Sequence, residues 1–63
     1  GDVRIQVSEA CDFEVRDGSG RTVLQGRWAA GSQTLEASAW PQGVYTLIVT
    51  GSTREVTRFS LQR

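Results

Sequence analysis

Apolar and polar residues alternate with a period of two along much of the chain. Residues 3–7 alternate aliphatic with polar side chains, and residues 12–16 repeat the alternation with Phe13 and Val15 as the apolar members. A period of two is typical of a β-strand that buries one face. The pattern therefore predicts strands over both segments, joined by a short connection at residues 8–10.

Four further segments have strand character and are separated by short stretches rich in small residues. They cover residues 21–28, 33–37, 44–50 and 54–62. The segment 44–50 is the most apolar, which is typical of a strand buried on both faces, so we expect it in a central position. No segment shows the periodicity of an amphipathic helix.

Two places within these strands break the regular pattern. Gly26 lies inside a predicted strand, and an interior glycine predicts either a bulge or a close approach to the backbone. Val56 and Phe59 are out of alternation with one another. We therefore expect a β-bulge near Thr57 or Arg58.

The segment Asp17–Gly20 predicts a tight turn. Asp-Gly is a strong hairpin motif because the turn needs a positive φ, which glycine adopts at little cost. We expect the carboxylate of Asp17 to hydrogen-bond the backbone of its own turn. A calcium loop would need several acidic oxygens, and Asp17 stands alone among Gly and Ser residues, so the turn is the preferred interpretation.

Turn motifs every eight to twelve residues, together with six or seven short strands, are typical of a sandwich or barrel. We predict one domain over residues 1–63, an all-β, small Ig-like antiparallel β-sandwich. The predicted core consists of Val3, Ile5, Val7, Phe13, Val15, Val23, Leu35, Trp40, Tyr45, Leu47, Val49, Phe59 and Leu61.

Composition narrows the possible functions of this 63-residue chain. Seven Arg balance seven acidic residues, which argues against a nucleic-acid footprint and a polybasic membrane patch. No apolar run reaches the length of a transmembrane helix. The chain has no His and one Cys, so we expect no metal site, no cofactor and no catalytic residues. Cys11 is predicted to be a small buried thiol, with intermolecular pairing or nucleophilic use as the alternatives.

The segment Trp40–Tyr45 has the pattern of a tyrosine corner, in which a phenol bonds a backbone group a few residues upstream. The predicted acceptor lies near Trp40 or Pro41. We expect Trp40 in the core, although an exposed Trp could instead anchor a partner. For Trp28 the sequence leaves both alternatives open.

The order of these parts carries a family resemblance. The chain contains FEVRDGSGRTVLQG and then GSQTLEASAWPQGVYTLIVTGSTREVTRFSLQR. Over roughly residues 11–63 it resembles the C-terminal sorting domain of the type IX secretion system of Bacteroidetes, although Trp40 stands where that family usually has Leu. The matching residues are Asp17, Gly20, Arg21 and Val23, then Gly31, Leu35, Gly43, Val44 and Tyr45, and finally Arg58, Phe59 and Leu61.

The resemblance implies a small Ig-like sandwich at the C-terminal end of a longer secreted protein. It implies a secretion and sorting signal, recognised by an outer-membrane translocon, that directs cargo through the periplasm to the cell surface. A sortase-like cysteine peptidase would be the second partner, and the domain itself would not be an enzyme. An Ig-like binding or adhesion module, or a structural cap on a surface protein, is the alternative.

A partner could add a strand to an open sheet edge or dock on that edge. The last predicted strand and the corner before residue 44 are the preferred places, and arginines could supply charge-assisted contacts. Single surface arginines are more often simply solvated. The candidate recognition residues are Gly20, Arg21, Trp40, Gly43, Tyr45, Arg58 and Arg63.

Overall fold

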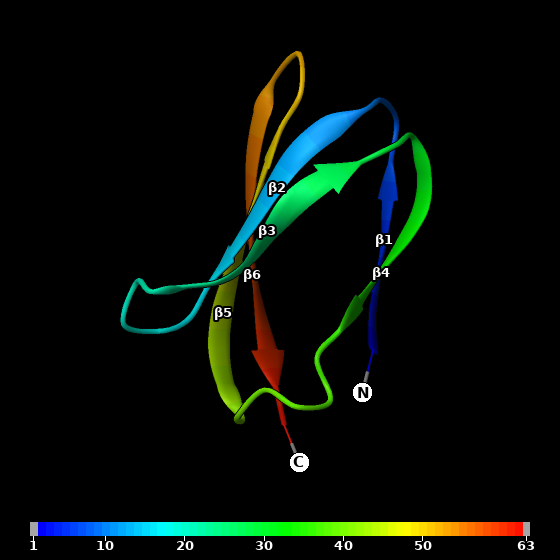
Figure 1. Ribbon diagram of the computed structural model, residues 1–63. Helices are drawn as coiled ribbons and strands as arrows, with labels where there is room; N and C mark the ends of the chain where they lie inside the picture. Colours follow the sequence, from blue (N-terminus) through cyan, green and yellow to red (C-terminus); the bar gives the residue numbers. More distant parts are fainter. Residues whose placement is uncertain (1, 63) are drawn as a thin grey trace.

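The computed structural model describes residues 2–62. Within that range the chain forms six strands and no helix (Figure 1). No helix that could span a membrane occurs in this part of the chain. The strands are β1 (Asp2–Val7), β2 (Cys11–Arg16), β3 (Thr22–Trp28), β4 (Gly31–Glu36), β5 (Gly43–Thr50) and β6 (Arg54–Leu61).

The strands form two antiparallel sheets that pack as a small sandwich. The larger sheet has the order β3-β2-β5-β6, and the smaller one pairs β1 with β4. In Figure 1 the two-stranded sheet stands beside the larger sheet, and the chain crosses between them after β1, after β3 and after β4. The predicted all-β antiparallel sandwich is confirmed. The most apolar strand, β5, lies between β2 and β6, which confirms its central position.

The core lies between the two sheets. Its buried members come from both sheets, because each strand turns alternate side chains inward. They are Val7, Cys11, Val15, Trp28, Leu35, Tyr45 and Leu47, and the half-buried residues packed against them are Val3, Ile5, Phe13, Trp40, Val49, Phe59 and Leu61. Every residue predicted for the core is in this set except Val23. Trp28, left open by the sequence, is buried, and so is Cys11.

Val23 is exposed because it lies on the edge strand β3, in which every residue from Thr22 to Arg27 is exposed, and the strand also carries a bulge at this position. Val15 pairs with Leu24 while Arg16 pairs with Thr22, so Val23 has no partner on β2. The extra residue turns its side chain out of the regular alternation, and its exposed fraction is 36%. The prediction that Val23 belongs to the core is therefore wrong.

The bulge predicted near Thr57 or Arg58 does not occur. β6 pairs with β5 in one unbroken register, from Gly43 opposite Leu61 to Thr50 opposite Arg54. Val56 is the cause of the wrong prediction, because it lies opposite Ile48 on the outer face of the sheet and is 60% exposed. Its apolar side chain suggested a buried position, although the strand alternates regularly around it.

Gly26 is a site of close approach. A Cβ atom at this position would lie 3.1 Å from Cε1 of Phe13, whose ring occupies the space beside the glycine. The same ring stacks on Trp28, with centroids 3.9 Å apart and an interplanar angle of 13°. Of the two alternatives predicted for Gly26, the close approach is confirmed, and an aromatic ring makes it.

Candidate recognition site

The turn after β2 and the corner before β5 lie against each other. An ideal Cβ on Gly18 would be 3.7 Å from the carbonyl oxygen of Val44. Asp17, Gly18, Pro41, Gly43 and Tyr45 all contribute to one surface hollow of about 340 Å³. Segments more than twenty residues apart in sequence therefore form one continuous surface at one end of the sandwich.

The turn is held by the Asp17 carboxylate. Its Oδ1 accepts hydrogen bonds from the backbone N–H of Ser19 and of Arg21, both at 3.0 Å, and from the Ser19 hydroxyl at 2.7 Å. The predicted bonding of Asp17 to its own turn is confirmed. These bonds, that of the Ser19 hydroxyl above all, hold the pKa of Asp17 below its ordinary value because they stabilise the ionised form.

The glycine with positive φ in this turn is Gly20, at 88°, and not the Gly18 of the Asp-Gly pair. The N–H of Gly20 bonds the carbonyl of Asp17 at 3.0 Å, and the N–H of Asp17 bonds the carbonyl of Arg21 at 2.9 Å. The loop is therefore longer than a two-residue hairpin, and a left-handed residue near its end returns the chain to the sheet. The location of the positive φ expected from Asp-Gly is corrected accordingly.

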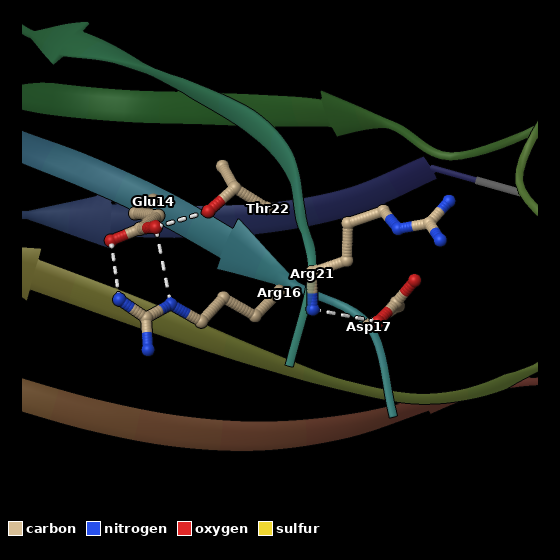
Figure 2. A network of polar contacts seen from close by, with 5 residues as sticks. All are labelled: Glu14, Arg16, Asp17, Arg21 and Thr22. Carbon is tan, nitrogen blue, oxygen red and sulfur yellow. Dashed lines mark hydrogen bonds and ion pairs between the residues drawn. The ribbon is translucent and has the colours of Figure 1, made fainter. Parts of the chain in front are cut away.

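A polar network on the outer face of the larger sheet supports this turn (Figure 2). Glu14 receives two hydrogen bonds from Arg16, at 3.1 and 3.3 Å, and a third from the hydroxyl of Thr22. The bond from Thr22, followed by those from Arg16, lowers the pKa of Glu14. Figure 2 shows the Arg21 side chain extending away from Glu14 and Arg16, on the side of the Asp17 carboxylate, whose pKa its charge helps to lower.

The corner is held by Tyr45. Its phenol donates a 2.6 Å hydrogen bond to the carbonyl oxygen of Pro41, which confirms the predicted tyrosine corner. The ring packs beside Trp40, with centroids 5.3 Å apart, and stacks with Phe59 at 5.7 Å. Trp40 is half-buried against the core, so most of this aromatic cluster stabilises the fold.

Arg58 lies on the outer face of β6, beside the same turn. In the cross-strand register Thr46 separates Arg58 from Arg16, and both arginines line a hollow of about 510 Å³ together with Gly18 and Gly20. The structure thus brings Gly20 and Arg58 to one hollow, and Gly43 and Tyr45 to the adjoining one. Arg63 lies outside the described residues. That these residues recognise a partner stays a prediction.

A family model described as the secretion system C-terminal sorting domain matches residues 1–61. The match spans the turn, the corner and all of β6. The chain belongs to this family. The resemblance in the sequence is thereby confirmed, and the domain is a C-terminal sorting signal for type IX secretion. Searches of curated proteins and of solved structures gave no significant match.

A sorting-signal family is not catalytic. Within residues 2–62 no three acidic, Cys or His residues come together as a metal site, and the single thiol, Cys11, is only 3% exposed.

Sequence reasoning missed the polar network around the turn of the sorting domain. Strand alternation places Glu14 and Arg16 on one face, so that pair was accessible from the sequence. The contact with Thr22 depends on the bulge at Val23, which sets the register between β2 and β3. A local pattern does not contain that register, because it arises from pairing with another strand.

Proposed function

We propose that the sorting domain is the C-terminal module of a longer secreted protein and carries that protein through the periplasm to the outer-membrane surface. We propose further that an outer-membrane translocon recognises the folded domain at the end where the turn and the corner meet. The observation that supports this proposal is the surface hollow that Asp17 and Gly18 of the turn share with Gly43 and Tyr45 of the corner, because it brings two distant parts of the family pattern to one surface.

The geometry of this end suits recognition of a folded signal. Three hydrogen bonds to Asp17 hold the turn, and the phenol of Tyr45 holds the corner. A preorganised surface loses little conformational entropy on binding, so more of the contact energy appears as affinity. Arg21 and Arg58 are exposed there and have no ion pair in the described part of the chain, so both are available for charge-assisted hydrogen bonds.

A sortase-like cysteine peptidase is the second partner that we propose. This role is carried over from the family, since sorting domains of this kind are often removed from their cargo. The domain has no histidine in its sequence and its cysteine is buried, so removal would require a separate enzyme.

The test is export of a reporter. A periplasmic reporter with this domain fused to its C-terminus is expressed in a host that has the type IX pathway. We expect the reporter at the cell surface, where external protease digests it, and we expect it in the periplasm of a host that lacks the translocon. A folded fusion that remains in the periplasm of the complete host would contradict the proposal.

The same assay tests the recognition surface. Arg21→Gln and Arg58→Gln should each lower the exported fraction, because each removes a charged donor beside the turn. Arg4→Gln is the matched control, since Arg4 is also exposed but lies on β1 in the other sheet. An equal loss of export in all three variants would contradict the proposed surface, because it would show that export depends on the overall charge of the domain.

An Ig-like adhesion module would display its aromatic residues, whereas Trp28 is buried and Trp40 is half-buried, so no observation favours that alternative.

A further inference from the structure

The larger sheet ends in an open edge at β6. β6 pairs with β5 over all eight of its residues, without a bulge, and no described strand covers its other side. Neither Pro nor Gly interrupts it. The opposite edge, β3, contains the bulge at Val23 and the glycine at position 26, which both disrupt strand addition. Of the two edges of this sheet, β6 is therefore the regular template for another strand.

The outer face of β6 has a specific charge pattern. Arg54, Val56 and Arg58 follow one another at every second position, so all three side chains lie on that face. Neither arginine makes an ion pair with any described residue, and Arg54 acts on Glu14 only through longer-range attraction. On β2 and β3, by contrast, Arg16 and Arg27 each pair with a carboxylate.

The half of the outer face formed by β5 and β6 carries no carboxylate. Its outward residues on β5 are Val44, Thr46, Ile48 and Thr50, since their neighbours Tyr45 and Leu47 are buried in the core. Ile48 lies opposite Val56 and is 9% exposed, which makes a small apolar centre between Arg54 and Arg58.

The inner side of the same edge borders a groove with both apolar and polar lining residues. This groove has a volume of about 430 Å³ and opens between β1 and β6. Its apolar walls come from Ile5 and Val7 on β1 and from Leu47 and Val49 on β5. Glu55 and Thr57 on β6 and Glu9 before β2 add polar lining, so uncharged inward residues of an added strand suit this groove best. The two-stranded sheet leaves this side of the four-stranded sheet uncovered, so a strand added to β6 would place its inward side chains over the groove.

We propose that β6 accepts an extended segment of a partner protein as an additional strand, and that this segment carries acidic residues at positions i and i+4 and an apolar residue at i+2. The two carboxylates would face Arg54 and Arg58, and the apolar residue would lie beside Val56. Residues i+1 and i+3 would turn toward the groove. The inference rests on the proposed function, since it assigns a chemistry to the partner that recognises the sorting domain.

Charge complementarity favours an acidic strand of a partner protein over a second copy of β6. Opposite charges on neighbouring strands attract when they share a face, and like charges repel. A second copy of β6 in a continuous sheet would bring two more arginines to the outer face and no carboxylate, so self-pairing is disfavoured. The acidic spacing is symmetric about the apolar residue, so the same pattern fits a parallel or an antiparallel strand.

The test uses two peptides of identical composition, acetylated and amidated at their ends to remove terminal charges. The first contains Glu-Val-Val-Thr-Glu, which places both acids on one face of a strand. The second contains Glu-Val-Val-Glu-Thr, which places them on opposite faces. Titration of the 15N-labelled domain should show saturable shift changes in Arg54–Leu61 and at the groove residues of β1. We expect the first peptide to bind at least fivefold more tightly.

Variants of the domain identify the residues responsible. Arg54→Gln with Arg58→Gln should weaken binding of the first peptide about tenfold, at about two- to fivefold for each exposed charge pair. Arg4→Gln should leave the affinity unchanged. Arg54→Glu with Arg58→Glu should bind a Lys-Val-Val-Thr-Lys peptide in place of the acidic one, which shows that a weakened variant still folds.

Equal affinity for the two acidic peptides, shift changes confined to β3, or dimerisation of the domain through β6 would each overturn the inference. If a variant does not fold, the affinities of the two peptides for the unaltered domain still test whether β6 prefers a strand with both acids on one face. Export of the reporter without peptide selectivity would leave the sorting function standing and remove only the acidic-strand partner. A reporter that is not exported would contradict the sorting function itself.

Discussion

The phenol of Tyr45 donates its hydrogen bond to the carbonyl oxygen of Pro41, four residues upstream, at 2.6 Å. This bond closes the corner through which the chain enters β5 from the loop after β4. The ring of Tyr45 is buried at 4% exposure between Trp40 and Phe59, so the residue combines core packing with a polar contact. Tyr45 therefore links the hydrophobic core to the surface formed by the turn after β2 and the corner before β5.

Replacement of Tyr45 by Phe should separate the two contributions of this residue. The variant keeps the ring and loses the hydrogen bond to Pro41, so we expect the free energy of unfolding to fall by about 1 kcal/mol. Tyr45→Ala should cost about 3–5 kcal/mol because it also leaves a cavity in the core. Urea unfolding followed by Trp fluorescence measures both. A Phe variant as stable as the original domain would show that the bond adds nothing to the packing of the ring.

The turn at Asp17 should make stability depend on acid pH. Folding lowers the pKa of Asp17 from its ordinary value of 3.8, chiefly through the Ser19 hydroxyl. The ionised carboxylate therefore stabilises the folded state at pH above this ordinary value, and the stabilisation is lost as the pH falls through the lower pKa of the folded state. Glu9 and Glu14, whose pKa values are also lowered, should act in the same direction.

Ser19→Ala tests the cause of that shift. The variant removes the hydrogen bond that lowers the pKa of Asp17 most, so this pKa should rise toward its ordinary value. The loss of stability in acid should then be smaller and confined to a narrower pH range just below that ordinary value. An NMR titration of the Asp17 side chain, together with urea unfolding between pH 7 and pH 2.5, provides both measurements. An unchanged titration in Ser19→Ala would assign the shift to the backbone donors instead.

The two glycines of the turn should respond differently to substitution. Gly20→Ala places a side chain at a φ of 88°, which should cost about 1 kcal/mol even though no atom lies within 4 Å of the new Cβ. Gly18→Ala meets only an ordinary 3.7 Å contact with the Val44 carbonyl and should be close to neutral. Thermal unfolding of both variants measures this difference. A Gly18→Ala variant that is less stable than Gly20→Ala would contradict the assignment of the positive φ to Gly20.

Gly26 should be intolerant of a methyl group for another reason. A Cβ at this position lies 3.1 Å from the Phe13 ring, which stacks on Trp28. Gly26→Ala should displace the ring and destabilise the domain by about 1–3 kcal/mol, as overpacking does. The near-UV circular dichroism of the stacked pair should weaken at the same time. Retention of that signal with a loss of stability would point to backbone strain rather than ring displacement.

Much of the fold and part of the candidate site follow from local sequence. The two-residue period locates the strands, and the spacing from Pro41 to Tyr45 is sufficient to predict the corner, because its hydrogen bond spans only four residues. Asp17 is likewise predictable, since its carboxylate bonds groups within its own turn. The order of the turn and the corner along the chain is also sufficient to indicate the sorting family.

The tertiary structure alone decided which face of each strand is buried and where the register shifts. Alternation separates two faces of β6 without saying which one meets the other sheet, so Val56 and Phe59 predicted a bulge, whereas Val56 lies on the outer face of a strand with unbroken register. The bulge lies at Val23 because of the pairing of β3 with β2, and the turn meets the corner because β2 pairs with β5. These relationships are contacts between segments distant in the chain, and short-range patterns carry no record of them.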